Sequence, residues 1–157
     1  MRAIVQRVSQ SEVKIGATRI SAIGPGMLVL VAVKRGDAEP DATALAERCA
    51  ALRIFADEEG KMNLSVQETG GSVMVVSQFT LYGDTSRGHR PSWGEAAPPE
   101  TAEHLYNLFV GALERLLGKP RVATGEFGAM MQVSLVNDGP VTVLLEGKSY
   151  IAATGSQ

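Results

Sequence analysis

Seven consecutive apolar residues, Met27-Leu28-Val29-Leu30-Val31-Ala32-Val33, follow the turn signal Gly24-Pro25-Gly26. The run has no polar position, whereas a strand with one face in water alternates apolar and polar residues. It is also far too short to span a bilayer, which takes about 20 residues. We therefore expect a strand buried on both faces, and this constrains the fold more than any other segment.

Two helices are expected from apolar residues at helical spacing. The first opens at Gly36-Asp37, with Pro40 in its first turn, where the missing N–H of proline is tolerated. Its apolar face comprises Ala42, Leu45, Cys49 and Leu52. The second helix follows Pro98-Pro99. Its apolar stripe comprises Leu105, Leu108, Phe109, Ala112, Leu113, Leu116 and Leu117.

Short strands surround these helices. Besides the central run, the predicted strands are Ala3 to Val8, Glu12 to Ile15, Arg19 to Ile23, Arg53 to Phe55, Ser72 to Leu81, Met131 to Val136 and Val141 to Glu146. Strands and helices follow no regular alternation, so the predicted class is α+β: a single compact domain of mixed β-sheet with two main helices. We place this domain at residues 1–146 and expect residues 147–157, which are small and polar, to form a flexible tail.

The charge balance limits the binding partners. The chain has 15 Lys and Arg against 17 Asp and Glu, a net charge of −2. Broad contact with a nucleic-acid backbone needs many Lys and Arg, so we expect no DNA partner, and a small RNA footprint such as one single-stranded end remains open. With one cysteine and two histidines, no disulfide, metal site or cofactor is expected. No targeting signal or membrane segment is apparent, which predicts a cytoplasmic protein.

The segment Ser77-Gln78-Phe79-Thr80-Leu81 is the first candidate for chemistry. Alternate Ser and Thr on a strand are ordinary sheet residues. A glutamine after an apolar strand, however, needs hydrogen-bond partners if it is buried, and its amide could bind a ligand carbonyl or hydroxyl. No histidine or acid lies beside Ser77 or Thr80 in sequence, which disfavours a nucleophile activated by its neighbours. A partner brought near by folding stays possible.

The segment Asn137-Asp138-Gly139-Pro140-Val141-Thr142 has two interpretations. Asp-Gly between two strands is typical of a hairpin turn. Alternatively, a cis Gly139-Pro140 bond would aim backbone carbonyls at a ligand, although cis bonds occur at only about 5–6% of X-Pro positions.

Two further segments stay open between structural and functional roles. The loop Asp84 to Trp93 holds two arginines, a histidine and a tryptophan, which could bind phosphates and stack on a base, or could simply be solvated. The segment Gly125 to Met131 could form a pocket wall or a bend between strands.

Taken together and in order, six motifs resemble the D-aminoacyl-tRNA deacylase family over about residues 1 to 146. They are Gln6-Arg7-Val8; Arg53-Ile54-Phe55 with Gly60-Lys61-Met62-Asn63; Ser77-Gln78-Phe79-Thr80-Leu81; Arg90-Pro91-Ser92; Phe127-Gly128-Ala129 with Met131-Gln132-Val133; and Asn137-Asp138-Gly139-Pro140-Val141-Thr142. Departures are modest: Ala32 stands where the family often has glycine, and Trp93 where it often has phenylalanine.

The resemblance implies the family fold and a homodimer with active sites at the subunit interface. Ser77 to Leu81 would line a pocket for the aminoacyl 3′ acceptor end of tRNA, with Gln78, Thr80 and Ser77 as the catalytic residues and neither hydroxyl an essential nucleophile. The implied substrate-binding residues are Gly139, Pro140, Arg7, Phe79 and Phe127. The Gly–Pro pair would be cis, braced by Arg7, and would reach into the partner's site, where its carbonyls leave no room for an L side chain. The 2′-hydroxyl of the terminal adenosine would supply the chemical assistance.

The predicted function is thus hydrolysis of the ester bond of D-aminoacyl-tRNA, and of mischarged glycyl-tRNA, which lacks a side chain to reject. Three alternatives remain. One is a related editing deacylase acting on L-aminoacyl-tRNA with a trans Gly–Pro bond, although Gln78 and Arg7 favour the D-specific branch. The others are a non-enzymatic RNA-binding module built on the Arg87 to Trp93 loop and a small-molecule esterase with Ser77 or Thr80 as nucleophile.

Overall fold

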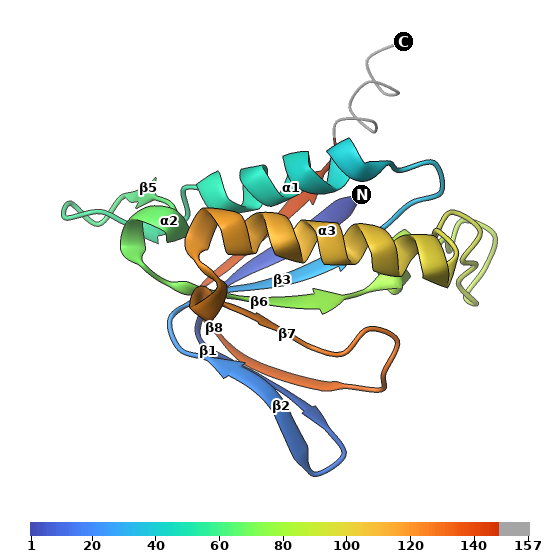
Figure 1. The fold of residues 1–157 in the computed structure, drawn as a ribbon, viewed down its shortest axis with the longest axis horizontal. Coiled ribbons are helices and arrows are strands. Elements are labelled where there is room, and N and C mark those ends of the chain that lie inside the picture. Colours follow the sequence, from blue (N-terminus) through green and yellow to red (C-terminus); the bar gives the residue numbers. More distant parts are fainter. Residues whose placement is uncertain (148–157) are drawn as a thin grey trace.

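The computed structural model describes residues 1–147, which form a six-stranded mixed sheet with two long helices packed on it, and a separate two-stranded sheet of β4 and β5 (Figure 1). The strands are β1 (Arg2–Ile15), β2 (Thr18–Ile23), β3 (Gly26–Ala32), β4 (Phe55–Ala56), β5 (Met62–Leu64), β6 (Ser72–Ser77), β7 (Val122–Thr124) and β8 (Gln132–Glu146). The helices are α1 (Glu39–Ala51), α2 (Val66–Thr69) and α3 (Pro99–Leu117), with 3₁₀ turns η1 (Phe79–Tyr82) and η2 (Lys119–Arg121). The predicted α+β class is confirmed, and α2 adds a single turn to the two main helices.

The long strand β1 organises the sheet, whose order is β2-β1-β3-β6-β7. Its first half pairs with β3 and its second half with β2, both antiparallel, while β8 runs antiparallel to β1 along its other edge. Strands β3, β6 and β7 are parallel neighbours. The chain thus places the carboxyl ends of β3 and β6 side by side, the edge of a parallel sheet where ligand sites commonly lie.

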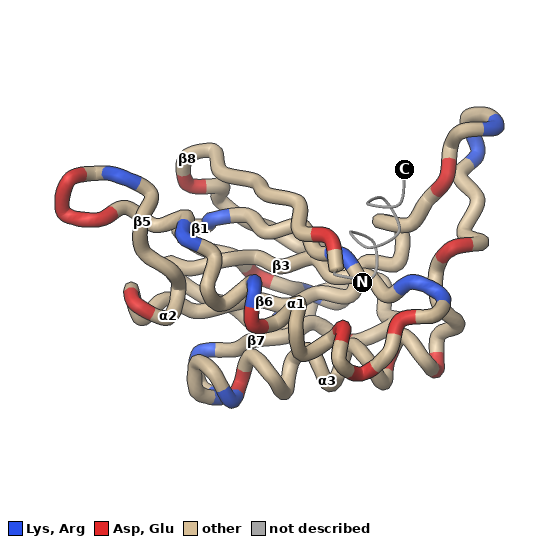
Figure 2. Tube along the Cα trace, turned by 90° about the horizontal axis from the view of Figure 1, so that it is seen from above, with Lys and Arg blue, Asp and Glu red and all other residues tan. Residues whose placement is uncertain are grey.

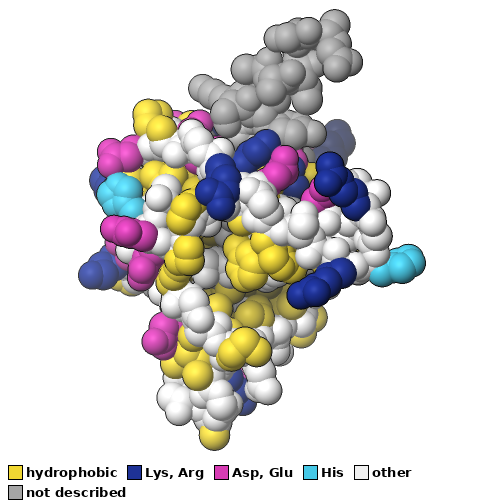
Figure 3. Space-filling model, turned by 90° about the vertical axis from the view of Figure 1, so that its right-hand side faces the viewer, with side chains coloured by type: hydrophobic (Ala, Val, Ile, Leu, Met, Phe, Trp, Pro, Cys, Tyr) yellow, Lys and Arg dark blue, Asp and Glu magenta, His cyan; other side chains and the backbone are white. Residues whose placement is uncertain are grey.

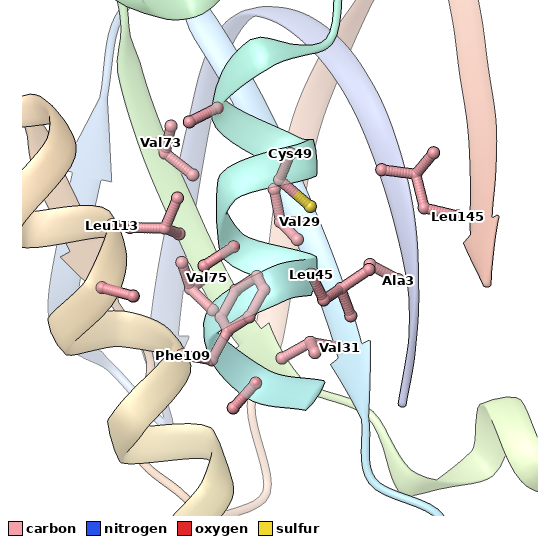
Figure 4. Close-up of a cluster of buried hydrophobic side chains, with 14 of the residues drawn as sticks. Ala3, Val29, Val31, Leu45, Cys49, Val73, Val75, Phe109, Leu113 and Leu145 are labelled. Atoms are coloured by element: carbon pink, nitrogen blue, oxygen red, sulfur yellow. The ribbon is translucent and has the colours of Figure 1, made fainter. Parts of the chain in front are cut away.

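Strand β3 is buried on both faces, as its uninterrupted apolar sequence predicts. One face, with Val29 and Val31, packs under α1 and α3, where Leu45 and Phe109 meet it (Figure 4). The opposite face, with Leu28, belongs to a second apolar cluster. The buried members of that cluster are Val8, Val13, Leu28, Met74 and Val76.

The helix starts follow local rules. Helix α1 begins at Glu39, because the Asp41 carboxylate accepts a hydrogen bond from the Ala38 N–H at 2.8 Å and Pro40 occupies the second position. Helix α3 begins at Pro99, directly after Pro98. The start of α1 is therefore two residues later than Gly36-Asp37 indicated.

Two predicted strand breaks are wrong. Ala3 to Val8 and Glu12 to Ile15 are parts of one strand, β1. Met131 to Val136 and Val141 to Glu146 likewise belong to one strand, β8. Both halves of β8 pair with β1 through backbone hydrogen bonds and do not pair with each other as strands, so the hairpin interpretation of Asn137 to Thr142 is incorrect.

Two other strands have different bounds from those predicted. Strand β6 ends at Ser77, because Gln78 leaves the strand conformation (φ −145°, ψ 74°) and the chain turns into η1. The predicted strand Arg53 to Phe55 is reduced to the two-residue β4. The end of β6 matters for function, since it delivers the Ser77 to Leu81 segment to the sheet edge.

At the end of the described chain, Gly147 is buried and its N–H donates to the Met1 carbonyl at 2.8 Å. The flexible tail predicted for residues 147–157 lies otherwise outside the described residues. Within residues 1–147, no helix has the length and apolar character needed to cross a membrane.

Candidate active site

A cavity of about 650 Å³ opens at the carboxyl ends of β3 and β6. Its walls are mostly apolar and come from four parts of the chain: the end of β3, the β6–η1 junction, the loop leading into α3 with the start of that helix, and the segment 127–131. Figure 3 views this side of the molecule and shows apolar side chains gathered at its centre. Four predicted site residues line the cavity together: Ser77, Gln78, Phe79 and Phe127.

Backbone hydrogen bonds hold the β6–η1 junction against β3. Ser77 is the last residue of β6 and pairs with Val31, and the Gln78 N–H donates to the Val31 carbonyl at 2.8 Å. Arg2 supports η1, because its guanidinium donates to the Leu81 carbonyl at 2.9 Å and lies 4.4 Å from the centre of the Tyr82 ring. The segment that lines the cavity is therefore fixed by the sheet at both ends.

Gln78 and Thr80 are linked by a short hydrogen bond from the Gln78 side-chain amide to the Thr80 hydroxyl. Thr80 is exposed and does not line the cavity, unlike Ser77 and Gln78. Among the described residues, the cavity lining contains no His, Asp, Glu or Lys, and Arg35 is its one charged residue. The arrangement can orient a polar substrate group, but it supplies no proton-accepting side chain beside either hydroxyl.

The inner wall pairs two aromatic rings. Tyr106 of α3 and Phe127 have ring centres 5.7 Å apart. The Tyr106 hydroxyl donates to the buried Val75 carbonyl at 3.1 Å, and burial raises the pKa of Tyr106 to about 12. Tyr106 is thus a neutral residue of the cavity wall. Its partner Phe127 lines the same wall, which agrees with the pocket-wall interpretation of Gly125 to Met131. Sequence analysis missed Tyr106, although its place beside Leu105 in the apolar stripe of α3 was a usable signal.

The rim of the cavity carries a second aromatic pair, Phe79 and Trp93, with ring centres 5.1 Å apart in an edge-to-face arrangement. Phe79 is 55% exposed and Trp93 is 41% exposed. A Cβ on Gly83 would lie 2.7 Å from the Trp93 ring, so the absence of a side chain there lets the indole pack down on the chain. Trp93 therefore ties the 83–93 loop to the cavity mouth.

The remaining predicted residues form a separate constellation on β1 and β8. Gln6 pairs with Thr142 and Val8 with Asn137, so Arg7 alone stands opposite four residues of β8, 138–141. This four-residue excursion, which we call the β8 bulge, contains Gly139 and Pro140, both exposed. The Gly139–Pro140 peptide bond is cis, as the family resemblance implied.

Two side chains close the β8 bulge. The Arg7 guanidinium donates to the carbonyls of Asp138 and Ile54, each at 2.7 Å. At the neck, the Asn137 amide accepts from the Val141 N–H at 2.8 Å and donates to the Thr142 hydroxyl at 3.1 Å. The predicted bracing role of Arg7 thus has a direct structural counterpart.

The structure therefore divides the predicted site residues into two groups. Ser77, Gln78, Phe79 and Phe127 share the cavity, with Thr80 bonded to Gln78 outside its lining, whereas Arg7 and the Gly139-Pro140 pair are also not among the lining residues and lie together on β1 and β8. Within residues 1–147, no group of three or more His, Cys, Asp or Glu residues is placed to hold a metal ion.

Comparison with known proteins identifies the family. The sequence profile of D-Tyr-tRNA(Tyr) deacylase matches residues 4–146. The chain belongs to this family. A protein named D-aminoacyl-tRNA deacylase from Roseiflexus sp. (strain RS-1) is 58% identical over 150 residues, covering 96% of each chain. One of the same name from Akkermansia muciniphila is 53% identical, covering 94% of this chain and 98% of that protein. The resemblance indicated by the six motifs is confirmed.

Solved structures agree on the fold. A structure described as c-Myc DNA Unwinding Element Binding Protein has a TM-score of 0.89 at 39% identity and covers 93% of this chain and 98% of its own. A probable eukaryotic D-amino acid tRNA deacylase has a TM-score of 0.79 at 17% identity, covering 92% and 97%. The second likeness bears on the fold alone.

Proposed function

We propose that this protein hydrolyses the ester bond of D-aminoacyl-tRNA, releasing the D-amino acid and tRNA. The observation that carries the proposal is the apolar cavity lined by Ser77, Gln78 and Phe79 in a chain that belongs to this family. Relatives bearing the deacylase name cover nearly the whole length of the chain.

The cavity suits the aminoacyl end of the substrate. Its apolar walls can take amino-acid side chains of many kinds. Gln78 lines the cavity, and we expect its amide to bind the ester carbonyl or a ribose hydroxyl. An aminoacyl ester is already activated, so the 2′-hydroxyl of the terminal adenosine can assist its hydrolysis without a protein base. Ser77, Gln78 and Thr80 then orient the ester, and neither hydroxyl acts as a nucleophile.

Chirality is read by the β8 bulge of a second subunit. The bulge is exposed and held by Arg7 and Asn137, so it can enter a partner's cavity as a preformed unit. The carbonyls of Gly139 and Pro140 would meet the substrate amino group and occupy the space that an L side chain needs. Such a steric filter leaves D side chains unread and cannot reject glycine, so glycyl-tRNA is also a substrate.

Paired substrates test the activity. We expect rapid deacylation of D-tyrosyl-tRNA and glycyl-tRNA and little deacylation of L-tyrosyl-tRNA. Equal rates on both enantiomers would exclude the chiral filter. Binding of tRNA with no turnover would favour the RNA-binding module, and turnover of L substrates alone would favour the related L-editing deacylase.

Mixed dimers test the shared site. Gln78→Ala damages the cavity and Gly139→Ala damages the bulge, so a mixed dimer of the two variants would have one site carrying both defects and one site carrying neither. Random reassociation should therefore restore about a quarter of wild-type activity if the bulge acts across the interface. No recovery, or a fully active monomer by light scattering, would contradict this arrangement.

The partner of the proposed enzyme is thus aminoacyl-tRNA in the cytoplasm, with no cofactor and no membrane. DNA is not proposed as a partner, since the net charge of −2 gives no broad basic face. A small-molecule esterase would need a nucleophile and base in the cavity, and the described lining offers no such pair.

A further inference from the structure

We propose that the loop of residues 83–93, the mouth loop, binds the phosphodiester backbone of the 3′ acceptor end of tRNA through Arg87 and Arg90. This rests on the proposed function, because it assumes that the cavity holds the aminoacyl end. It assigns a separate surface to the rest of the substrate.

The mouth loop is anchored at the cavity rim. Asp84 and Ser92 exchange two backbone hydrogen bonds of 2.9 Å at its base. The Asp84 carboxylate accepts from the Ser86 N–H at 2.9 Å, and these hydrogen bonds to Ser86 lower the pKa of Asp84. Trp93 packs against Gly83 and Phe79 beside them. Whatever the mouth loop binds is therefore held at a set position relative to the cavity.

The mouth loop carries a net positive charge, with Arg87 and Arg90 against Asp84. Arg87, His89 and Arg90 are exposed, and within residues 1–147 neither arginine has an ion-pair partner. The one acid of the loop, Asp84, is engaged in the Ser86 turn. By contrast, Lys34 lies 3.7 Å from the Glu95 carboxylate. Free arginines are suited to phosphate, because the guanidinium can donate two parallel hydrogen bonds to its oxygens.

These charges lie where a nucleic-acid strand would run as it leads away from an aminoacyl end held in the cavity. In Figure 2 the mouth loop projects well beyond the body, with Lys and Arg colouring at its far end. Figure 3 shows Lys and Arg mainly on one flank of the apolar centre and Asp and Glu mainly on the other. Arg35 lines the cavity and donates to the Gly94 carbonyl at 2.8 Å, so a further cation lies between the cavity and the loop.

The reach of the loop is also suitable. Arg87 is three residues beyond Asp84, so it can extend about 10 Å from the base of the loop at about 3.3–3.6 Å per residue. A nucleic-acid strand advances about three nucleotides over that length at about 3.4 Å each. The arginines would then meet phosphates a few nucleotides from the aminoacyl end, where sequence-independent contacts fix the register of the bound strand.

The test is the double variant Arg87→Gln, Arg90→Gln, with deacylation of D-tyrosyl-tRNA measured over a range of salt concentrations. We expect KM to rise about tenfold at low salt with kcat unchanged, and the slope of log(kcat/KM) against log salt to fall by about 1.5 for two lost phosphate contacts. The urea midpoint should not move, since both side chains are exposed. An unchanged KM and salt slope would overturn the proposal.

A matched control removes the same charge elsewhere. Arg115→Gln with Lys119→Gln neutralises two cations at the far end of α3, about 28 Å of helix away from the mouth loop. This control should behave as wild type in KM and in salt slope. An equal loss in the control would show that only net charge matters and would contradict a specific contact.

A minimal substrate separates this proposal from the proposed function. D-tyrosyl-adenosine has none of these backbone phosphates, so wild type and the Arg87/Arg90 variant should hydrolyse it equally. Loss in the variant on this substrate would overturn the proposal, because the loop would then serve the cavity. Failure of wild type on both substrates would instead defeat the proposed function.

Discussion

The Arg7 guanidinium donates to the Asp138 carbonyl at 2.7 Å and occupies the place where one residue of β1 stands opposite four residues of β8. The same side chain donates to the Ile54 carbonyl at 2.7 Å. Arg7 therefore connects the exposed β8 bulge to the segment that follows α1. Arg7, together with Asn137 at the neck of the bulge, thus holds the Gly139-Pro140 pair on the sheet.

Arg7→Ala should release the β8 bulge. Hydrogen bonds from a charged donor contribute about 1.5–3 kcal/mol each when buried, and these are partly exposed, so we expect unfolding free energy to fall by about 1–3 kcal/mol. Discrimination between D- and L-tyrosyl-tRNA should fall more than overall stability does. Arg7→Lys should recover the charge but not both hydrogen bonds, since an ammonium lacks the planar fork. Urea unfolding and paired deacylation assays check this, and wild-type discrimination in Arg7→Ala would refute it.

Gly139→Ala should distort the same bulge. Gly139 has φ +151°, and an added Cβ would lie 2.8 Å from the Val141 nitrogen and 3.2 Å from the Arg7 guanidinium. A residue forced into this region costs about 1–3 kcal/mol. We expect at least a tenfold loss in kcat/KM for D-tyrosyl-tRNA.

The matched control for Gly139→Ala is Gly24→Ala, where an added Cβ meets nothing within 4 Å and φ is not positive. It should keep wild-type activity and stability. If Gly24→Ala and Gly139→Ala lose activity to the same extent, the loss in Gly139→Ala cannot be attributed to distortion of the β8 bulge.

Ser77→Ala and Thr80→Ala should each keep activity within about tenfold of wild type, because no described side chain lining the cavity can activate a hydroxyl as a nucleophile. Gln78→Ala should lose more, since it removes the amide that we propose binds the ester. A substrate ending in 2′-deoxyadenosine should react poorly with all four proteins. Mass spectrometry of quenched reactions should detect no acyl-enzyme, and a trapped acyl group on Ser77 or Thr80 would end this interpretation.

Cys49 should be inert in the native protein. It is fully buried on the inner face of α1, and burial raises the pKa of its thiol to about 12. Since only the thiolate attacks disulfide reagents, labelling at pH 8 should be negligible, and it should stay slow at pH 9, where the thiol is still almost wholly protonated. In guanidinium chloride the single cysteine should react fully. Rapid native labelling would mean that the helix layer opens readily.

The sequence by itself determined the features that depend on local pattern. An uninterrupted apolar run predicts a strand with both faces buried, since no polar position could face water. Apolar residues at helical spacing predict α1 and α3, because a helix with one apolar face is stable when that face is buried against the sheet. The family motifs are likewise local strings, and Ser77 to Phe79 predicted one edge of the cavity without any knowledge of what lies opposite.

Only the tertiary structure decided how distant segments meet. Asp138-Gly139 gives the same local signal in a hairpin and in a bulge, and the difference lies in hydrogen bonds to β1, more than 130 residues away. Tyr106 joins the cavity only because α3 crosses the end of β6. The separation of the β8 bulge from the cavity was also decided only by the tertiary structure. It depends on strand pairing and layer packing between distant segments, and the local sequence of either segment carries no signal of that pairing.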